Sequence, residues 1–236
     1  MTTEFDSFDQ SAFGAFVQTP FDARNDPQGR VLIWRQNRSS LLVISRLNRI
    51  AAIYTELGIE NANETNWTGN INDYSLIIWA MAISDAPWMP QVRANTWRGR
   101  LFITGEWYPG AASAHLPMIN YCNSLSSLHG MSIPSVTFPP SENPFPARIM
   151  FGPTKPNPLT AGVASIAYNL SAFVQGGNAL ASMETVPTGI WIAQNYRNGM
   201  DWILSGDAAP PQEEGSANWA TRNTKFFENL AKVPLG

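Results

Sequence analysis

The sequence is poor in residues that carry strong chemistry, with one cysteine, Cys122, and only two histidines in 236 residues. One thiol excludes a disulfide framework within the chain, and a free thiol is typical of a reducing compartment. The acidic N-terminus lacks the apolar core of a signal peptide, and no run approaches the roughly eighteen apolar residues of a membrane span. We therefore expect an intracellular, cytoplasmic protein without a membrane partner.

Metal and nucleophile motifs are also missing. His115, Cys122 and His129 are spaced seven residues apart, which places them along one helix face. Seven helical residues rise about 10.5 Å, whereas the ligands of one zinc ion lie about 2.0 to 2.3 Å from the metal. We interpret the three as structural. Walker A, G-x-G-x-x-G and G-x-S-x-G patterns are absent as well, so the sequence predicts no metal site, no cofactor and no catalytic set.

Charge is scarce too, because charged residues make up 14% of the chain, whereas a soluble domain usually has about a quarter. Arginine outnumbers lysine by 12 to 3, and there are 9 Trp and 8 Met. Depletion of charge with enrichment of these residue types is typical of buried interfaces. The composition indicates a self-associating protein, although compositional drift in a lineage explains it equally well.

Against this background, residues 29–58 stand out as locally basic. The stretch has no acidic residue before Glu56 in a chain of net charge −3. Its second half has the apolar spacing of a helix, which Ser39 or Ser40 caps and Gly58 ends. A basic face backed by an apolar one suits a phosphate backbone, so we expect single-stranded RNA to bind here. The residues expected to contact RNA are Arg30, Arg35, Arg38, Arg46 and Arg49.

The periodicity predicts a mainly α protein: a single helical domain with a short β element, long Pro-rich loops and extended N-terminal and C-terminal arms. The predicted helices after the basic one cover residues 74–86, 112–128, 159–174, 189–204 and 218–231. The β-branched and aromatic segment at residues 101–107 predicts the short strand. The region 130–158 is rich in proline and predicts an irregular excursion.

Three regions follow from this reading: an N-terminal arm at 1–28, a helical core domain at 29–205, and an acidic linker with a C-terminal helix at 206–236. The first arm alternates acids with phenylalanine, and such aromatics are costly to leave in water. We expect both ends of the chain to contact neighbouring copies. The residues expected to form these assembly contacts are Phe5, Phe8, Phe13, Phe16, Trp219, Phe226 and Phe227.

These features favour a self-assembling structural protein and not an enzyme, specifically a viral coat or nucleocapsid protein of the virion, in a helical assembly around RNA. The alternative is an enzyme or small-ligand-binding protein in which Glu106 acts as acid or base. A second carboxylate, such as Asp201, is then its partner. Its apolar pocket is expected to contain Trp79, Trp88, Trp97, Trp107 and Trp191. A third reading is a small oligomer whose arginine face binds an acidic protein.

Overall fold

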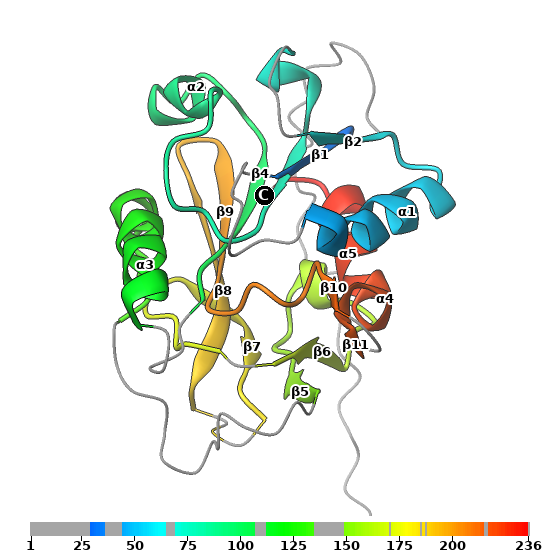
Figure 1. The fold of residues 1–236 in the computed structure, drawn as a ribbon, viewed down its shortest axis with the longest axis vertical. Coiled ribbons are helices and arrows are strands. Elements are labelled where there is room, and N and C mark those ends of the chain that lie inside the picture. The colour runs from blue at the N-terminus through cyan, green and yellow to red at the C-terminus, as the bar shows by residue number, and fades with distance from the viewer. Residues whose placement is uncertain are drawn as a thin grey trace, which may run out of the picture.

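The structure is a computed structural model, and it describes residues 29–35, 44–64, 69–106, 112–134, 149–169, 171–184, 186, 188–214 and 217–235. A seven-stranded sheet runs through the described structure in the order β2-β1-β3-β4-β9-β8-β7 (Figure 1). The strands from β2 to β9 are parallel, and β8 and β7 extend the sheet antiparallel. Their bounds are β1 Val31–Trp34, β2 Asn61–Glu64, β3 Leu76–Trp79, β4 Arg100–Thr104, β7 Asn178–Ser182, β8 Ile190–Arg197 and β9 Met200–Ser205.

Helices cover both faces of this sheet, as Figure 1 shows with α2 and α3 on one side and α1 and α5 on the other. Alternate strand residues feed the two layers, so Ile33 and Phe102 pack on the α1 and α5 side and Leu32 and Leu101 on the α2 and α3 side. The helices are α1 Asn48–Glu56, α2 Met89–Arg93, α3 Ala112–Ser126, α4 Trp219–Arg222 and α5 Thr224–Lys232, with 3-10 turns η2 Ile44–Leu47, η3 Ile71–Asp73, η5 Ser127–His129 and η6 Pro158–Thr160. Two small antiparallel sheets pair β5 Met150–Pro153 with β6 Ser165–Tyr168, and β10 Glu213–Glu214 with β11 Ala217–Asn218.

The fold is therefore α/β, and the prediction of a mainly α protein is wrong. Residues 74–86 contain β3 instead of a helix, and residues 159–174 contain η6 and β6. Every residue of β3 is buried because both faces of the parallel sheet are covered. Such a strand has no polar side, and a short, continuously apolar run gives the same sequence signal as a buried helix.

The predicted helix at 189–204 is also wrong, because these residues form β8 and most of β9. Asn198 and Gly199 join the two strands, with φ values of 55° and 76°. An Asn-Gly pair between two apolar runs favours the left-handed turn of a tight hairpin. This local signal is present in the sequence and outweighs the helical spacing of the flanking residues.

Several element predictions are confirmed. A helix, α3, begins at Ala112 within the expected range, the β element near 101–107 is β4, and α4 with α5 covers residues 219–232 with a break at Asn223, close to the expected 218–231. Gly58 follows the end of α1 with φ 70°, as expected for a residue that ends a helix in the left-handed region. The described part of the basic helix consists of η2 and α1, from Ile44 to Glu56, and the expected cap at Ser39 or Ser40 lies outside the described residues.

The segment after β9, expected to be an acidic linker, is packed into the fold. Residues 206–212 are buried, and Gln212 donates from Nε2 to the Ala208 carbonyl at 2.6 Å. Asn223, between α4 and α5, donates to and accepts from the backbone of Ala167 in β6 at 2.9 and 2.7 Å. The bonds of Asn223 hold the C-terminal helices against β6. Among the helices of the described residues, none combines the length and apolar character that a bilayer crossing demands.

Candidate functional site at the carboxyl edge of the sheet

The parallel strands β2, β1, β3, β4 and β9 all end at one edge of the sheet. Counted by their order in the chain, they stand in the order 2-1-3-4-5, which is one of the common doubly wound arrangements. In open sheets of this kind, ligands bind outside the carboxyl ends of the strands. A ligand site is therefore expected among the residues that follow these strands.

Two carboxylates lie beside each other at this edge. The β4 to β9 pairing reaches Thr104 and Ser205 and extends to Gly105, whose N–H donates to the Ser205 carbonyl at 2.9 Å. Glu106 and Asp207 are the next side chains along the two strands. Glu106 Oε2 accepts from the N–H of residue 208 at 3.3 Å, and Asp207 Oδ1 accepts from the N–H of residue 209 at 2.7 Å. Consecutive backbone amides thus hold the two acids.

Asp207 is buried without a cationic partner. The residue is 1% exposed, and its Oδ2 accepts a second amide hydrogen bond, from Asn169, at 2.7 Å. Burial raises the pKa of Asp207 to about 7, although the two amides oppose that rise. No ion pair with Asp207 is formed by the residues that the structure describes. An acid with a pKa near 7 can hold or release a proton at neutral pH.

Gly206 brings Asp207 close to the neighbouring loop. A Cβ at Gly206 would lie 2.1 Å from the Ala172 carbonyl oxygen, so a larger residue does not fit there without movement. In return, the Ala172 N–H donates to the Gly206 carbonyl at 3.0 Å. Ser205 Oγ donates to the Asp207 carbonyl at 2.7 Å and stabilises the turn from inside. The backbone after β9 is therefore fixed before any ligand arrives.

The turn after β3 has an unusual backbone. Met81 has φ 56°, which is uncommon for a residue other than glycine, and its N–H donates to Thr104 Oγ1 at 2.9 Å. Cys122 of α3 packs under the same turn, with Sγ 3.6 Å from the Ala82 carbonyl and 3.5 Å from that of Thr104. Burial raises the pKa of Cys122 to about 12, so its thiol is protonated and unreactive at neutral pH. The edge offers acid–base groups and no thiolate.

The predicted partner of Glu106 lies elsewhere. Asp201 stands near the start of β9 and forms a buried ion pair with Arg100 at 2.6 Å. Six residues of strand separate Asp201 from Asp207, a span of about 20 Å. The neighbour of Glu106 in the described structure is Asp207, which sequence reasoning missed because residues 206 onward were assigned to a linker. The signal available was a polar residue directly after the buried strand MDWILS.

The histidines and cysteine of α3 and η5 do not converge. Cys122 lies against the end of β4, whereas His129 stacks on Trp202 with ring centroids 4.3 Å apart. Burial lowers the pKa of His115 and, with the nearby Arg197, lowers that of His129 to about 4. Within the described residues, no group of three His, Cys, Asp or Glu side chains is placed to hold a metal ion.

The tryptophans expected to line one pocket are split between the two faces of the sheet. Trp79 and Trp88 meet edge to face at 5.0 Å on the α2 and α3 side, and Trp97 donates to the Tyr74 carbonyl there at 2.9 Å. Trp191 is buried on the opposite face. Trp107 lies outside the described residues. The four described tryptophans are core residues, each at most 1% exposed.

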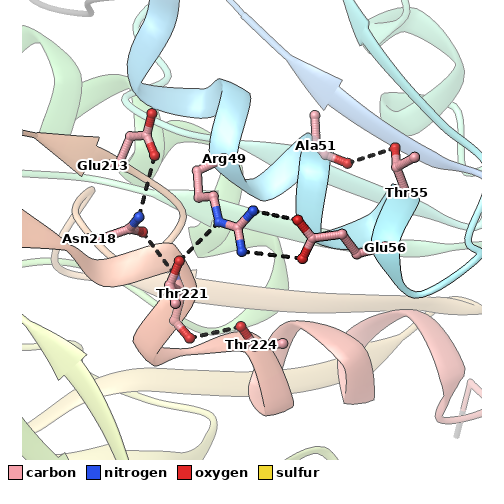
Figure 2. Close-up of polar contacts among 8 residues, drawn as sticks. All are labelled: Arg49, Ala51, Thr55, Glu56, Glu213, Asn218, Thr221 and Thr224. Carbon is pink, nitrogen blue, oxygen red and sulfur yellow. Dashed lines mark hydrogen bonds and ion pairs between the residues drawn. The ribbon is translucent and has the colours of Figure 1, made fainter.

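Two of the arginines expected to bind RNA, Arg30 and Arg49, form ion pairs with carboxylates of this chain. Figure 2 shows Arg49 between α1 and α4, where its guanidinium donates to both carboxylate oxygens of Glu56 at 2.6 and 3.2 Å and to Thr221 Oγ1 at 3.0 Å. Arg30, before β1, pairs with Glu60 at 2.7 Å. At the other end of β1, Arg35 donates to the Asn63 carbonyl at 3.0 Å. Arg46 lies on η2, and Arg38 lies outside the described residues.

The described residues expected to form assembly contacts lie inside the protein's own core. Phe226 and Phe227 of α5 are fully buried and pack edge to face on Phe102, with centroids 6.1 and 5.7 Å away. Trp219 is 6% exposed. Phe5, Phe8, Phe13 and Phe16 lie outside the described residues.

Comparison with known proteins finds similarity only at the level of structure. No family model matches the sequence, and no curated protein does. The β-galactosidase from Rahnella sp. R3 matches with TM-score 0.54 and 15% identity over 86% of this chain and 31% of that one. The cytoplasmic protein STM3548 from Salmonella typhimurium matches with TM-score 0.54 and 10% identity over 86% and 98%. The carbohydrate deacetylase Agd3 matches with TM-score 0.50 and 10% identity over 87% and 32%.

These matches correct the functional expectations. The chain spans about a third of the galactosidase and deacetylase chains, and identities of 10 to 15% describe a shared fold alone. That fold is an α/β fold found among enzymes, which contradicts both the coat or nucleocapsid protein and the expectation of a protein without enzymatic activity. The virion location, the helical assembly and the RNA-binding role are withdrawn with the mainly α fold on which they depended.

Proposed function

We propose that the protein is an enzyme, or a small-ligand-binding protein, that takes a small hydroxyl-rich molecule of the carbohydrate class at the carboxyl edge of its sheet. Glu106 is the acid–base group, and Asp207 is the neighbouring acid that tunes it. The observation that carries the proposal is the placement of these two carboxyl groups on consecutive amides after neighbouring parallel strands. The carbohydrate class is supported by the galactosidases and the carbohydrate deacetylase that share the fold.

The chemistry follows from the unequal environments of the two acids. Glu106 is half-buried and its bond from Ala208 is long at 3.3 Å, whereas Asp207 is buried and accepts two short amide hydrogen bonds. Neighbouring carboxyl groups resist simultaneous ionisation, so one holds a proton while the other is charged. Such a pair can donate a proton to a leaving oxygen or take one from water or a hydroxyl. Glu106, the more accessible acid, is the one that touches substrate.

The test is hydrolysis and binding by wild type and Glu106→Gln. A panel of nitrophenyl glycosides and acetylated sugars measures turnover, and saturation-transfer NMR with free sugars measures binding. Loss of one acid–base group lowers turnover by about 100-fold or more. Glu228→Gln is the matched control, because Glu228 pairs with Lys225 and Lys232 on the exposed face of α5.

The two parts of the proposal fail separately. Turnover that is equal in wild type and Glu106→Gln removes Glu106 from the acid–base role, and where sugars bind without turnover, equal binding removes Glu106 from the site. The absence of both turnover and binding across the panel removes the carbohydrate class.

An intracellular location is part of the same proposal. The lone cysteine is buried as a free thiol, which is compatible with a reducing compartment. The matching Salmonella protein is itself named a cytoplasmic protein. Fractionation of the native host cell tests this, with recovery in the soluble cytoplasmic fraction as the expected result.

A further inference from the structure

A cavity of about 290 Å³ lies at the opposite end of β9 from Glu106 and Asp207. It is enclosed by α2, by the end of α3 with η5, and by the turn between β8 and β9. Trp202 lines the cavity and lies five residues before Asp207 in the chain. In extended backbone, five residues span about 17 Å. A molecule bound here therefore does not touch the two acids. The cavity is large enough for a compact molecule of one or two rings, at the small end of ligand sites.

The wall of the cavity is mostly apolar. Met89 and Val92 come from α2, Leu125 from α3, Leu128 from η5, and Met200 from β9. Leu128 is 59% exposed, which is unusual for a large apolar side chain, and it stands beside the opening. The indole of Trp202 is held in place because its Nε1 donates to Ser126 Oγ at 3.0 Å and its ring stacks on His129 at 4.3 Å. A flat apolar group is the natural occupant of such a space.

The charged groups of the wall are cationic. Arg93 and Arg197 both line the cavity beside the neutral Asn95 and Asn198, and none of the described lining residues is acidic. Arg93 already pairs with Asp85 at 2.7 Å. Arg197 donates from Nη1 to the Leu128 carbonyl at 2.9 Å, which fixes its guanidinium, and forms no ion pair with any described carboxylate. Its remaining N–H groups suit a carboxylate, which guanidinium binds in two-pronged fashion.

A further polar atom lacks a partner. Nδ1 of His129 is buried and has no hydrogen-bond partner among the described residues. Such an atom costs free energy unless a ligand or water bonds to it. The His129 carbonyl accepts from Asn195 Nδ2 at 2.6 Å, so the backbone of this residue is fixed.

From these contacts we infer that the cavity is a second ligand site, selective for a small carboxylic acid with a flat apolar body, whose carboxylate pairs with Arg197 and whose body packs against Trp202 and Leu125. The site stands apart from the proposed acid–base centre. Its expected occupant is an anion and not the neutral carbohydrate proposed for the other edge, because two arginines and no acidic residue are among the described residues of the wall.

The experiment titrates the full chain with benzoate and with benzamide, its neutral counterpart of the same shape, and follows the indole N–H signals by two-dimensional NMR. Trp202→Phe assigns the signal of that indole. Benzoate is expected to shift the Trp202 signal and to bind about tenfold more tightly than benzamide. Arg197→Gln is expected to weaken benzoate about tenfold and to leave benzamide unchanged. Arg222→Gln, an exposed arginine on α4, is the matched control and leaves both unchanged.

A second variant fixes the location. Leu128→Trp fills the mouth of the cavity from an exposed position, so the fold tolerates it, and benzoate binding is expected to be lost. Equal affinity for benzoate and benzamide overturns the role of Arg197, and so does an Arg197→Gln variant with wild-type affinity. No shift of the Trp202 signal at about 10 mM benzoate, tenfold above a millimolar Kd, overturns the site itself.

Discussion

Two buried aspartates, six residues apart at the two ends of β9, have opposite environments. Asp201 forms an ion pair with Arg100 at 2.6 Å and accepts from Gln194 Nε2 at 2.7 Å. Arg100 in turn donates to the carbonyls of Leu230, Val233 and Pro234 near the end of α5. Arg100 and Asp201 are therefore partnered by each other and by carbonyls near the end of α5. Asp207, at the other end, accepts only backbone amides.

The difference distinguishes an ionised aspartate that stabilises the fold from an aspartic acid that can take part in proton transfer. The buried Arg100–Asp201 ion pair joins β4, β9 and the end of the C-terminal helix. A buried acid without a cation keeps its proton to about pH 7. Perturbed acids of the second kind are concentrated at functional sites. The carboxyl edge of the sheet, with Asp207, is therefore the expected site of catalysis. The Arg100–Asp201 pair at the amino end of β4 and β9 stabilises the fold.

The largest effect is expected at the structural end. Asp201→Asn leaves the Arg100 guanidinium buried without its counter-charge, and breaking such a pair costs about 3–5 kcal/mol of unfolding free energy. Urea denaturation followed by tryptophan fluorescence measures it. The double variant Arg100→Met with Asp201→Leu is expected to lose less than Asp201→Asn alone, because it leaves no unpaired charge. A loss below about 1 kcal/mol for Asp201→Asn contradicts the structural role.

The next effect is a pH dependence from Asp207. Its folded-state pKa of about 7 is raised above the usual value of 3.8, so between these pH values the folded chain binds the extra proton. Stability from this group is therefore greatest below pH 4 and is lost as pH rises towards 7, with a slope of up to about 1.4 kcal/mol per pH unit. Denaturation of wild type and Asp207→Asn at pH 5, 6 and 7 measures the difference in slope.

His129 provides the internal control for that measurement. Its pKa is lowered, so the unfolded chain binds the extra proton between about pH 4 and 6.5, and stability from this group rises with pH. The signs are opposite, so His129→Gln and Asp207→Asn must change the slope in opposite directions. Parallel changes in the two variants contradict the assignment of the Asp207 proton.

The sequence predicted elements whose signals are local. α5 is amphipathic and buries Phe226, Phe227 and Leu230, Gly58 stands at a left-handed position after α1, and β4 combines β-branched with aromatic residues. The sheet itself was missed because β3 and β9 are buried on both faces and lack alternation. Non-local pairing, such as the contact between β4 and β9 across about a hundred residues, leaves no mark in a single stretch of sequence.

The same limit explains the site. Glu106 was recognised from its aromatic neighbours, but its partner depended on knowing that residues 104 and 205 are adjacent in the sheet. Asp201 was chosen because Trp202 follows it, and that tryptophan in fact packs against His129 at the other end of the strand. The arginine stretch has the local positive charge that its sequence indicates. In the fold, however, Arg30 pairs with Glu60 and Arg49 pairs with Glu56, and these two acids lie beyond and near the end of the stretch.

The smallest effect on the free energy of unfolding is expected for Glu106→Gln, in contrast to the large loss expected for Asp201→Asn. Glutamine has the size of glutamate, and its carbonyl oxygen can still accept from the N–H of Ala208. The bond is long at 3.3 Å and the side chain is half-exposed, so Glu106→Gln is expected to change the unfolding free energy by less than about 1 kcal/mol at pH 7. Thermal and urea denaturation measure this on the same preparation used for turnover. A loss of unfolding free energy as large as that of Asp201→Asn would make Glu106 a structural residue. A variant that stays stable but loses turnover would support the role of Glu106 as an acid–base group.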